Sequence, residues 1–146
     1  MAWEGEYEPN PHNWVADHVA RYEESNGNKG RTMNGRPVVI LTTRGAKSGK
    51  IRKVPLMRVS DGTRYAAVAS LGGAPNHPVW YYNLVAHPDE VRLQDGPVVK
   101  EYRARLAEGA EREEWWDRAV EAYHEYADYQ KKTDRVIPLF VLEPVD

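Results

Sequence analysis

Turn signals between short β-branched segments constrain the fold of this chain more than any other feature. Ser60-Asp61-Gly62-Thr63 and Asp95-Gly96 are both strong signals for tight turns, and each joins two segments with strand composition. Strands joined by such short turns run antiparallel, because a parallel connection needs a crossover of a dozen or more residues. The sequence therefore predicts an antiparallel sheet.

Six segments have the composition and alternation of β-strands, and three have the periodicity of helices. The predicted strands are Pro37–Thr43, Ile51–Val59, Arg64–Ser70, Glu90–Gln94, Val98–Leu106 and Val136–Leu142. The predicted helices are Asn10–Ser25, Pro78–Ala86 and Glu108–Tyr129. Six short antiparallel strands with interposed helices are typical of a barrel-like or α+β fold, mainly β with helices.

The N-terminal third is expected to be a helix followed by a flexible stretch. Asn10 and Pro11 have the pattern of an N-cap and first helical position, and apolar residues recur at helical spacing at Trp14, Val15, Val19 and Tyr22. The glycines and asparagines of residues 26–30 predict its end. No repeat or linker divides the chain, so residues 1–146 are expected to form a single domain, with the helix at about 10–25 and the barrel and its helices at about 36–146.

Composition excludes several kinds of chemistry. The chain has no cysteine, which removes disulfides, thiolate metal sites and cysteine nucleophiles. Its five histidines lack metal-ligand spacing, so no metal is expected, and no G-x-S-x-G or Walker pattern is present. Residues 1–11 do not resemble a secretory signal, and apolar runs such as Val38–Leu41 are too short to span a membrane. A cytoplasmic location is expected.

Charge is strongly segregated along the chain, although the net charge is only −2. No acidic residue occurs between Ser25 and Ser60. The same stretch carries nine positive charges, at Lys29, Arg31, Arg36, Arg44, Lys47, Lys50, Arg52, Lys53 and Arg58. A basic stretch in an otherwise acidic protein attracts anions to one face. Because the stretch lacks interleaved aromatic residues, the anion is not expected to be a nucleic acid.

The loop between the first two predicted strands, residues 42–53, is the best candidate for holding that anion. Its glycines allow close backbone approach, Ser48 offers a hydroxyl, and five cations stand within ten residues. These groups suit phosphate and carboxylate oxygens. The alternative is a solvated hairpin tip whose lysines serve solubility, and the sequence leaves both interpretations open.

Two further segments are candidates for the same site. In Ser70–Asn83 a strand ends in small residues and a helix begins, which exposes backbone N–H groups. The alternative is that Gly72 and Gly73 only make a turn while Trp80 and Asn83 pack. Tyrosines recur at i, i+3 and i+6 at Tyr123, Tyr126 and Tyr129, which predicts one helical face. Such a face suits either a core stripe or the wall of a pocket that can donate hydrogen bonds.

These segments together resemble a known family. The motifs are Leu41-Thr42-Thr43-Arg44-Gly45-Ala46-Lys47-Ser48-Gly49, Pro55-Leu56, Ala69-Ser70 with Gly72-Gly73-Ala74, Pro78-Val79-Trp80-Tyr81, Asn83-Leu84, Tyr126-Ala127-Asp128-Tyr129-Gln130, Thr133–Leu139 and Glu143-Pro144. In this order, over roughly Val38–Pro144, they resemble the deazaflavin (F420)-dependent nitroreductase family of actinobacteria. Several motifs in one order are far more specific than any one alone.

The resemblance implies a split β-barrel related to flavin-mononucleotide-binding (FMN-binding) oxidoreductases, with coenzyme F420, a 5-deazaflavin bearing a phosphodiester and an oligoglutamate tail. By position, the phosphate would be held by Lys47, Ser48 and Arg52, with Arg44 and Lys50 added on the charge argument. The ring would contact the backbone of Val54, Pro55 and Leu56, and the remainder would be framed by Gly72, Gly73, Ala74, Trp80 and Asn83. The acceptor pocket would be lined by Ser70, Tyr123, Tyr126 and Tyr129. Leu71 departs from the pattern, since a lysine would help to hold the acidic tail there.

The expected activity is hydride transfer from the reduced deazaflavin to a small acceptor such as a quinone or a nitroaromatic compound. One alternative is an FMN-dependent enzyme on the same barrel, although a single phosphate needs fewer cations. Another is a non-catalytic deazaflavin-binding protein. The amphipathic first helix could serve a dimer or make peripheral contact with the inner face of a membrane, and the sequence does not decide the oligomeric state.

Overall fold

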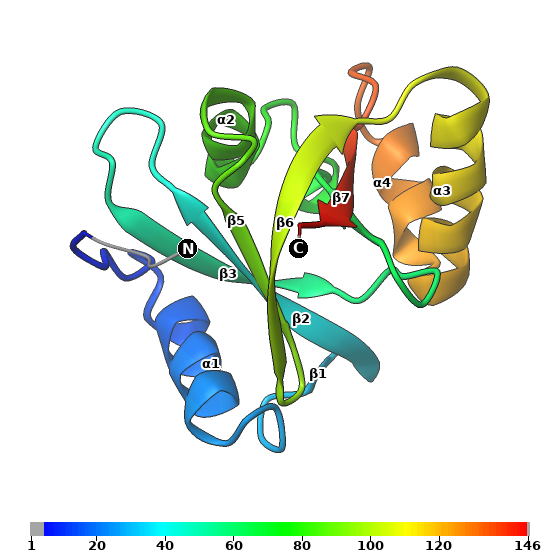
Figure 1. Cartoon of the computed structure of the whole chain (residues 1–146). Coiled ribbons are helices and arrows are strands. Elements are labelled where there is room, and N and C mark those ends of the chain that lie inside the picture. The colour runs from blue at the N-terminus through cyan, green and yellow to red at the C-terminus, as the bar shows by residue number, and fades with distance from the viewer. Residues whose placement is uncertain (1–4, 146) are drawn as a thin grey trace.

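The fold is taken from a computed structural model, in which residues 5–145 are described. Within that range, seven strands form one curled antiparallel sheet (Figure 1). They are β1 (Thr32–Met33), β2 (Arg36–Arg44), β3 (Ile51–Met57), β4 (Tyr65–Val68), β5 (Val91–Asp95), β6 (Val98–Leu106) and β7 (Leu139–Pro144). Their order is β1-β2-β5-β6-β7-β4, and β3 pairs with β2 outside this path. The expected α+β split barrel of antiparallel strands is therefore confirmed.

Strand β2 is buried on both faces and divides the core into two apolar clusters. Val38 and Ile40 belong to one cluster, while Val39 and Leu41 belong to the other. This alternation follows from the period of two in a β-strand, and it explains why the sequence of β2 is a continuous apolar run. Strand β7 repeats the pattern, with Leu139 and Phe140 on opposite faces.

The helices cover both faces of the sheet. They are α1 (Asn13–Glu24), α2 (Val79–Ala86), α3 (Gly109–Ala122) and α4 (Glu125–Lys131), with a short 3₁₀ turn η1 (Leu71–Gly73). Residues of α1, α3 and α4 enter the first cluster, whereas those of α2 enter the second. In Figure 1, α1 and the α3–α4 pair stand at opposite sides of the molecule. None of these helices is long and apolar enough to cross a membrane.

The predicted helix Glu108–Tyr129 is wrong as one continuous element. Helix α3 ends before Tyr123, whose φ of −151° and ψ of 99° are extended, and α4 begins two residues later. No glycine or proline marks this break in the sequence. The helical spacing of apolar residues therefore predicted one helix across it. The three tyrosines thus do not share one helical face.

The stretch after α1, predicted to be flexible, instead contains a two-residue hairpin turn. Asn34 and Gly35 have φ values of 53° and 75°, and Met33 pairs with Arg36 on the other side. Asn-Gly is the preferred dipeptide where both central residues need positive φ. This turn adds strand β1, which raises the strand count above the expected six.

The start of α1 also differs from the prediction. The helix begins at Asn13 with His12 at the N-cap, and Asn10 lies outside it. The Asn10 side-chain oxygen accepts the His12 backbone N–H at 2.8 Å, so it closes a turn ahead of the helix. Trp14, expected among the apolar positions of this helix, is 63% exposed.

Tyr22 joins α1 to the sheet and generates a test of the fold. Its side chain is 1% exposed, and its hydroxyl accepts the Gly96 N–H at 2.7 Å and lies 3.2 Å from the Val38 carbonyl oxygen. Changing Tyr22→Phe leaves these groups without their partner and should lower the free energy of unfolding by about 1–2 kcal/mol. The measurement is urea denaturation. Tyr82→Phe, which removes a half-exposed hydroxyl, is the matched control, and equal stability of the two variants would contradict this role.

Candidate active site

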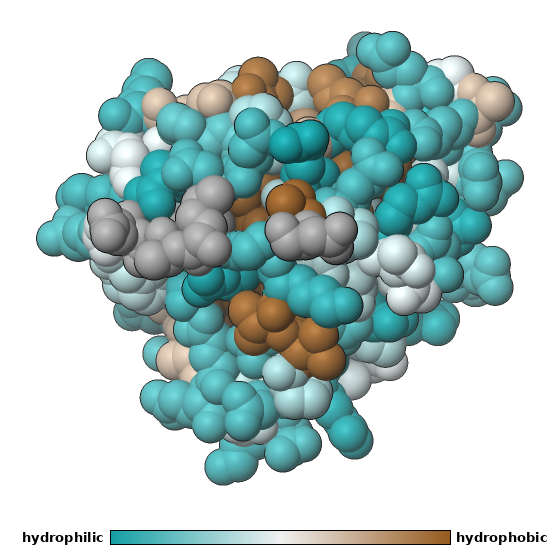
Figure 2. All heavy atoms as spheres, in the orientation of Figure 1, coloured by the Kyte–Doolittle hydropathy of each residue, from teal (hydrophilic) through white to brown (hydrophobic). Residues whose placement is uncertain are grey.

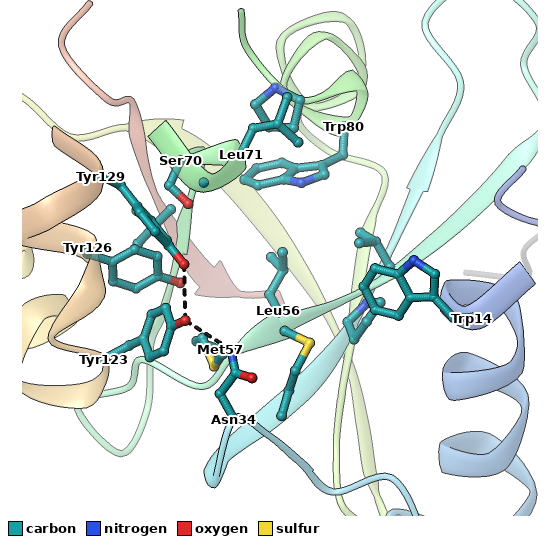
Figure 3. A pocket seen from close by; sticks show the side chains of 16 residues that line it. Trp14, Asn34, Leu56, Met57, Ser70, Leu71, Trp80, Tyr123, Tyr126 and Tyr129 are labelled. Carbon is teal, nitrogen blue, oxygen red and sulfur yellow. Dashed lines mark hydrogen bonds between the residues drawn. The ribbon is translucent and has the colours of Figure 1, made fainter. Parts of the chain in front are cut away.

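A pocket of about 350 Å³ opens between the sheet and the helices (Figure 3). Strand β3 forms its floor, the tyrosines of the α3–α4 break form one wall, and Trp14 of α1 stands opposite them. Turn η1 and Trp80 of α2 close the remaining side. The lining residues are Trp14, Met33, Asn34, Val54, Pro55, Leu56, Met57, Val68, Ser70, Leu71, Gly72, Pro78, Trp80, Tyr123, Tyr126 and Tyr129.

The floor of the pocket is a sheet edge. Strand β3 pairs only with β2 among the named strands, so along Val54, Pro55 and Leu56 its other side has no strand partner. An edge strand presents unpaired backbone N–H and C=O groups, and proline is tolerated there because it has no N–H to donate. A flat heteroaromatic ring with polar edges can hydrogen bond to such an edge. This edge therefore offers hydrogen-bonding groups to a flat ring.

The tyrosine hydroxyls form the polar part of the pocket. The hydroxyls of Tyr123 and Tyr129 lie 3.1 Å apart, and the Asn34 side-chain N–H donates to Tyr123 at 3.1 Å (Figure 3). Tyr126 packs edge-on against Tyr123, with ring centroids 5.1 Å apart. Its own hydroxyl has no hydrogen-bond partner within residues 5–145. The pocket thus contains a phenol O–H that is free to bind a ligand.

Two of these tyrosines, Tyr126 and Tyr129, have a raised pKa. Burial, followed by the neighbouring tyrosines, raises the pKa of Tyr126 well above its ordinary value of 10. The hydrogen bond with Tyr123, followed by burial, raises the pKa of Tyr129 to about 12. Both groups are therefore hydrogen-bond donors at neutral pH and are poorly suited to act as bases.

Close backbone packing brings η1 to the tyrosines. A Cβ atom at Gly73 would lie 2.7 Å from the Tyr129 carbonyl oxygen, and Gly73 has a φ of 83°. Only glycine meets both conditions without strain. Ser70 precedes this turn, and Figure 3 shows its hydroxyl directed into the pocket beside Tyr129.

Arg135 holds the segment that carries Ser70. Its guanidinium group donates to the carbonyl oxygens of Ala69, Ser70 and Ala74 at 3.0, 2.7 and 2.9 Å. Burial lowers the pKa of Arg135 from its ordinary value, though an arginine stays charged in proteins. Three carbonyls separated by at most five residues are thereby fixed by one side chain from the C-terminal segment. Arg135 entered the sequence analysis only through the resemblance.

The basic loop, residues 42–53, contributes no residue to the pocket lining, and its predicted residues differ in availability. Lys47 and Ser48 are exposed at the tip, and no described residue forms an ion pair with Lys47. Arg44 is held by Glu90 and the Gly49 carbonyl oxygen. Asn83 accepts the Ala46 N–H and donates to Thr43, so its amide positions the loop from behind.

Acidic residues from other segments neutralise much of the basic stretch. Lys50 pairs with Glu6 and Glu8, and Arg52 pairs with Glu8 at 2.6 Å. Glu23 pairs with Lys53, and Asp95 pairs with Arg58. The segregation of charge along the sequence is therefore partly cancelled in space, which linear reasoning did not anticipate.

The structure brings together only part of the predicted site. The lining includes Val54, Pro55, Leu56, Gly72, Trp80, Ser70 and the three tyrosines. It does not include Arg44, Lys47, Ser48, Lys50, Arg52, Gly73, Ala74 or Asn83. Sequence reasoning assigned no site role to Trp14, Met33, Asn34, Val68 or Pro78. Trp14 had been assigned to an apolar helix face, and Asn34-Gly35 signals a turn and nothing more.

In residues 5–145 no cluster of three or more histidine or acidic side chains is placed to hold a metal ion.

One solved structure similar to this protein is described as a reductase. The protein resembles a structure described as an F420-H2 dependent reductase (FDR-A), with a TM-score of 0.70 and 59% identity, covering 74% of this chain and 95% of that one. It also resembles a structure described as a domain-swapped dimer, with a TM-score of 0.72 and 52% identity, covering 92% of this chain and all of that one. The fold and the site thus define an oxidoreductase of the F420-dependent class.

The chain belongs to the F420H2-dependent quinone reductase family, whose model matches residues 14–144. It is 36% identical over 131 residues to the F420H2-dependent quinone reductase Rv1261c of Mycobacterium tuberculosis, covering 86% of each chain. It is 37% identical over 108 residues to the putative F420H2-dependent quinone reductase Rv3178 of the same species, covering 74% of this chain and 90% of that one. The resemblance found in the sequence is confirmed, and the coenzyme is F420.

The ion pair between Glu8 and Arg52 generates a test of the phosphate site. If Arg52 binds the coenzyme phosphate, the Glu8 carboxylate competes for it. Glu8→Gln should then tighten coenzyme binding by about two- to fivefold, the equivalent of one exposed ion pair. Fluorescence titration measures this affinity. Glu24→Gln is the matched control: it removes the same charge from an exposed residue that forms no ion pair within residues 5–145. Equal affinities of the two variants would exclude Arg52 from the phosphate site.

Proposed function

We propose that this protein transfers a hydride from F420H2 to a quinone held in the 350 Å³ pocket. The observation that carries the proposal is one cavity with an unpaired strand edge as its floor and protonated tyrosines as its wall. The floor suits the polar edge of a flat coenzyme ring, and the wall suits an acceptor whose oxygen gains negative charge. Both ligands would then lie within a single cavity.

The chain offers separate groups for each part of the coenzyme. Lys47, Ser48 and Arg52 would hold the phosphate, with Arg44 and Lys50 beside them, and Asn83 would act through the loop. The backbone of Val54, Pro55 and Leu56 would orient the ring, while Trp80 and the turn at Gly72, Gly73 and Ala74 would frame it. When bound, F420H2 supplies a hydride, so the protein needs no nucleophilic side chain.

The acceptor requires a proton donor as well as a hydride. A quinone becomes a hydroquinone by gaining two electrons and two protons, which one hydride and one proton supply together. While the hydride arrives, one quinone oxygen develops negative charge, and a preorganised O–H donor stabilises that charge. Tyr126 has an O–H without a hydrogen-bond partner among the described residues, and Ser70 points to the same space (Figure 3). Tyr123 and Tyr129 complete this wall of the acceptor pocket.

We propose a quinone as the acceptor because the family is described as quinone reductases. Nitroaromatic compounds, which the sequence resemblance also implies, stay a prediction. Apolar side chains of Met33, Val68, Leu71 and Trp14 surround the polar groups, so a hydrophobic ring fits better than a charged acceptor.

The first experiment is titration of the protein with oxidised F420 and, in parallel, with FMN, followed by tryptophan fluorescence. Trp80 lines the pocket and should report the ring. We expect binding of F420 alone, weakened by Lys47→Ala, because this exposed cation has no ion-pair partner among the described residues and can therefore pair with a phosphate. A preference for FMN would overturn the coenzyme assignment. Binding of F420 without quinone reduction would favour a non-catalytic binding protein.

Measuring kcat and F420 affinity in the same variants distinguishes residues of the acceptor wall from residues that bind the coenzyme. Tyr126→Phe and Ser70→Ala should lower kcat for quinone reduction, Tyr126→Phe by about tenfold to a hundredfold, because each loses a hydrogen bond to a developing charge. The affinity for F420 should not change. Steady-state kinetics with a quinone and with a nitroaromatic compound gives these values, with Tyr82→Phe as the control outside the pocket. Unchanged kcat in both variants would exclude these hydroxyls from the reaction.

A further inference from the structure

The hydrogen bonds around Asn34 limit what the tyrosine pair can do with its protons. Tyr123 and Tyr129 together carry two O–H protons, and the contact between them at 3.1 Å uses one. Asn34 approaches Tyr123 at 3.1 Å with its N–H group, so it offers a donor and takes no proton. No other described residue is hydrogen-bonded to either hydroxyl. One proton of the pair therefore stays uncommitted.

This count does not depend on which tyrosine donates to the other. If Tyr123 donates to Tyr129, the Tyr129 proton is left over. If Tyr129 donates instead, the Tyr123 proton is left over and must point away from the Asn34 N–H. Both residues line the pocket, and Figure 3 shows their hydroxyl oxygens on its side, so we infer that the remaining proton is available there in either case.

We propose that Asn34 is a positioning residue for quinone reduction: its N–H occupies one side of the Tyr123 hydroxyl oxygen and so directs the uncommitted O–H of the Tyr123–Tyr129 pair toward the acceptor oxygen. This inference rests on the proposed function of the pocket. Asn34 need not touch the acceptor, because it acts through Tyr123. The break of the helix at Tyr123 is what directs this side chain toward the β1–β2 turn.

Asn34 also has a conformational role in the β1–β2 turn. With a φ of 53°, followed by Gly35 at 75°, this position favours Asn, Asp or Gly in a two-residue hairpin turn. The two roles can be separated, because Asp and Gly also suit the turn but differ in their hydrogen bonding. An aspartate accepts protons only, and a glycine has no side chain.

Asn34→Asp should close the site to the acceptor without disturbing the turn. The carboxylate would accept the Tyr123 proton, and Tyr123 would accept the Tyr129 proton, so neither proton would remain for the quinone. We expect kcat to fall by about tenfold to a hundredfold, the effect of one hydrogen bond to a developing charge. Asn34→Gly should lower kcat by less, since a glycine has no side chain to accept either proton.

The decisive experiment is a double-mutant cycle with Tyr123→Phe. Without the Tyr123 hydroxyl, an aspartate at position 34 cannot hold the pair's protons, so Asn34→Asp/Tyr123→Phe should match the kcat of Tyr123→Phe alone. If Asn34→Asp lowers kcat equally in both backgrounds, its charge is the cause and the proposal is wrong. Equal kcat for Asn34→Asp and the natural protein would also overturn it.

A second measurement does not depend on turnover. In the protein without coenzyme, tyrosinate absorbance should appear at higher pH in Asn34→Asp than in the natural protein, because the carboxylate opposes loss of a proton from the pair. This difference should shrink in the Tyr123→Phe background, and an undiminished difference would contradict direct hydrogen bonding. F420 affinity should be the same in all variants. If the natural protein binds F420 but reduces no quinone, the proposed function fails, and that outcome is distinct from a failure of the cycle.

Discussion

The double burial of strand β2 is the constraint on which the rest of the structure depends. Its alternating side chains supply both apolar clusters, and its backbone pairs with β1, β3 and β5. Because β2 carries β3 as an edge strand, the far side of β3 is left for a ligand. Because β2 also carries β1, the Asn34-Gly35 turn lies where Asn34 can reach Tyr123. A packing requirement of the core thus fixes two walls of the pocket.

The polar groups of the site divide into those that are already bonded and those that are available. Hydrogen bonds to loop backbone atoms already engage the side chains of Asn83, Arg135 and Arg44. Tyr126, Ser70 and Lys47 keep groups that a ligand can use. The distinction depends on geometry, since the sequence does not tell which polar side chains already have hydrogen-bond partners. Figure 2 shows that this face of the protein is largely hydrophilic, with a few apolar patches. Among the apolar residues of the described range, Val98 and Val99 of β6 are half-exposed.

The sequence predicted the parts of the structure that depend on local chemistry. The turns at Asp61-Gly62 and Asp95-Gly96 placed the antiparallel strands nearly correctly, and strand β6 has the predicted bounds. The spacing of apolar residues and the His87-Pro88 pair at its end predicted α2 within one residue. The prediction failed where the local signal was weak or absent. Nothing in the residues around Tyr123 announces the break between α3 and α4, and the Asn34-Gly35 dipeptide was not recognised as a hairpin turn.

What the sequence by itself determined is the family, the antiparallel sheet and the identity of the groups that could bind a phosphate or an oxyanion. These follow from residue types in a fixed order, which a linear reading can detect. Only the tertiary structure decided which of those groups are free. Glu8 lies 44 residues before Arg52 and Asn34 lies 89 before Tyr123, yet each pair is in hydrogen-bond contact. Hydrogen bonds and ion pairs act over a few ångströms in space and carry no signature along the chain.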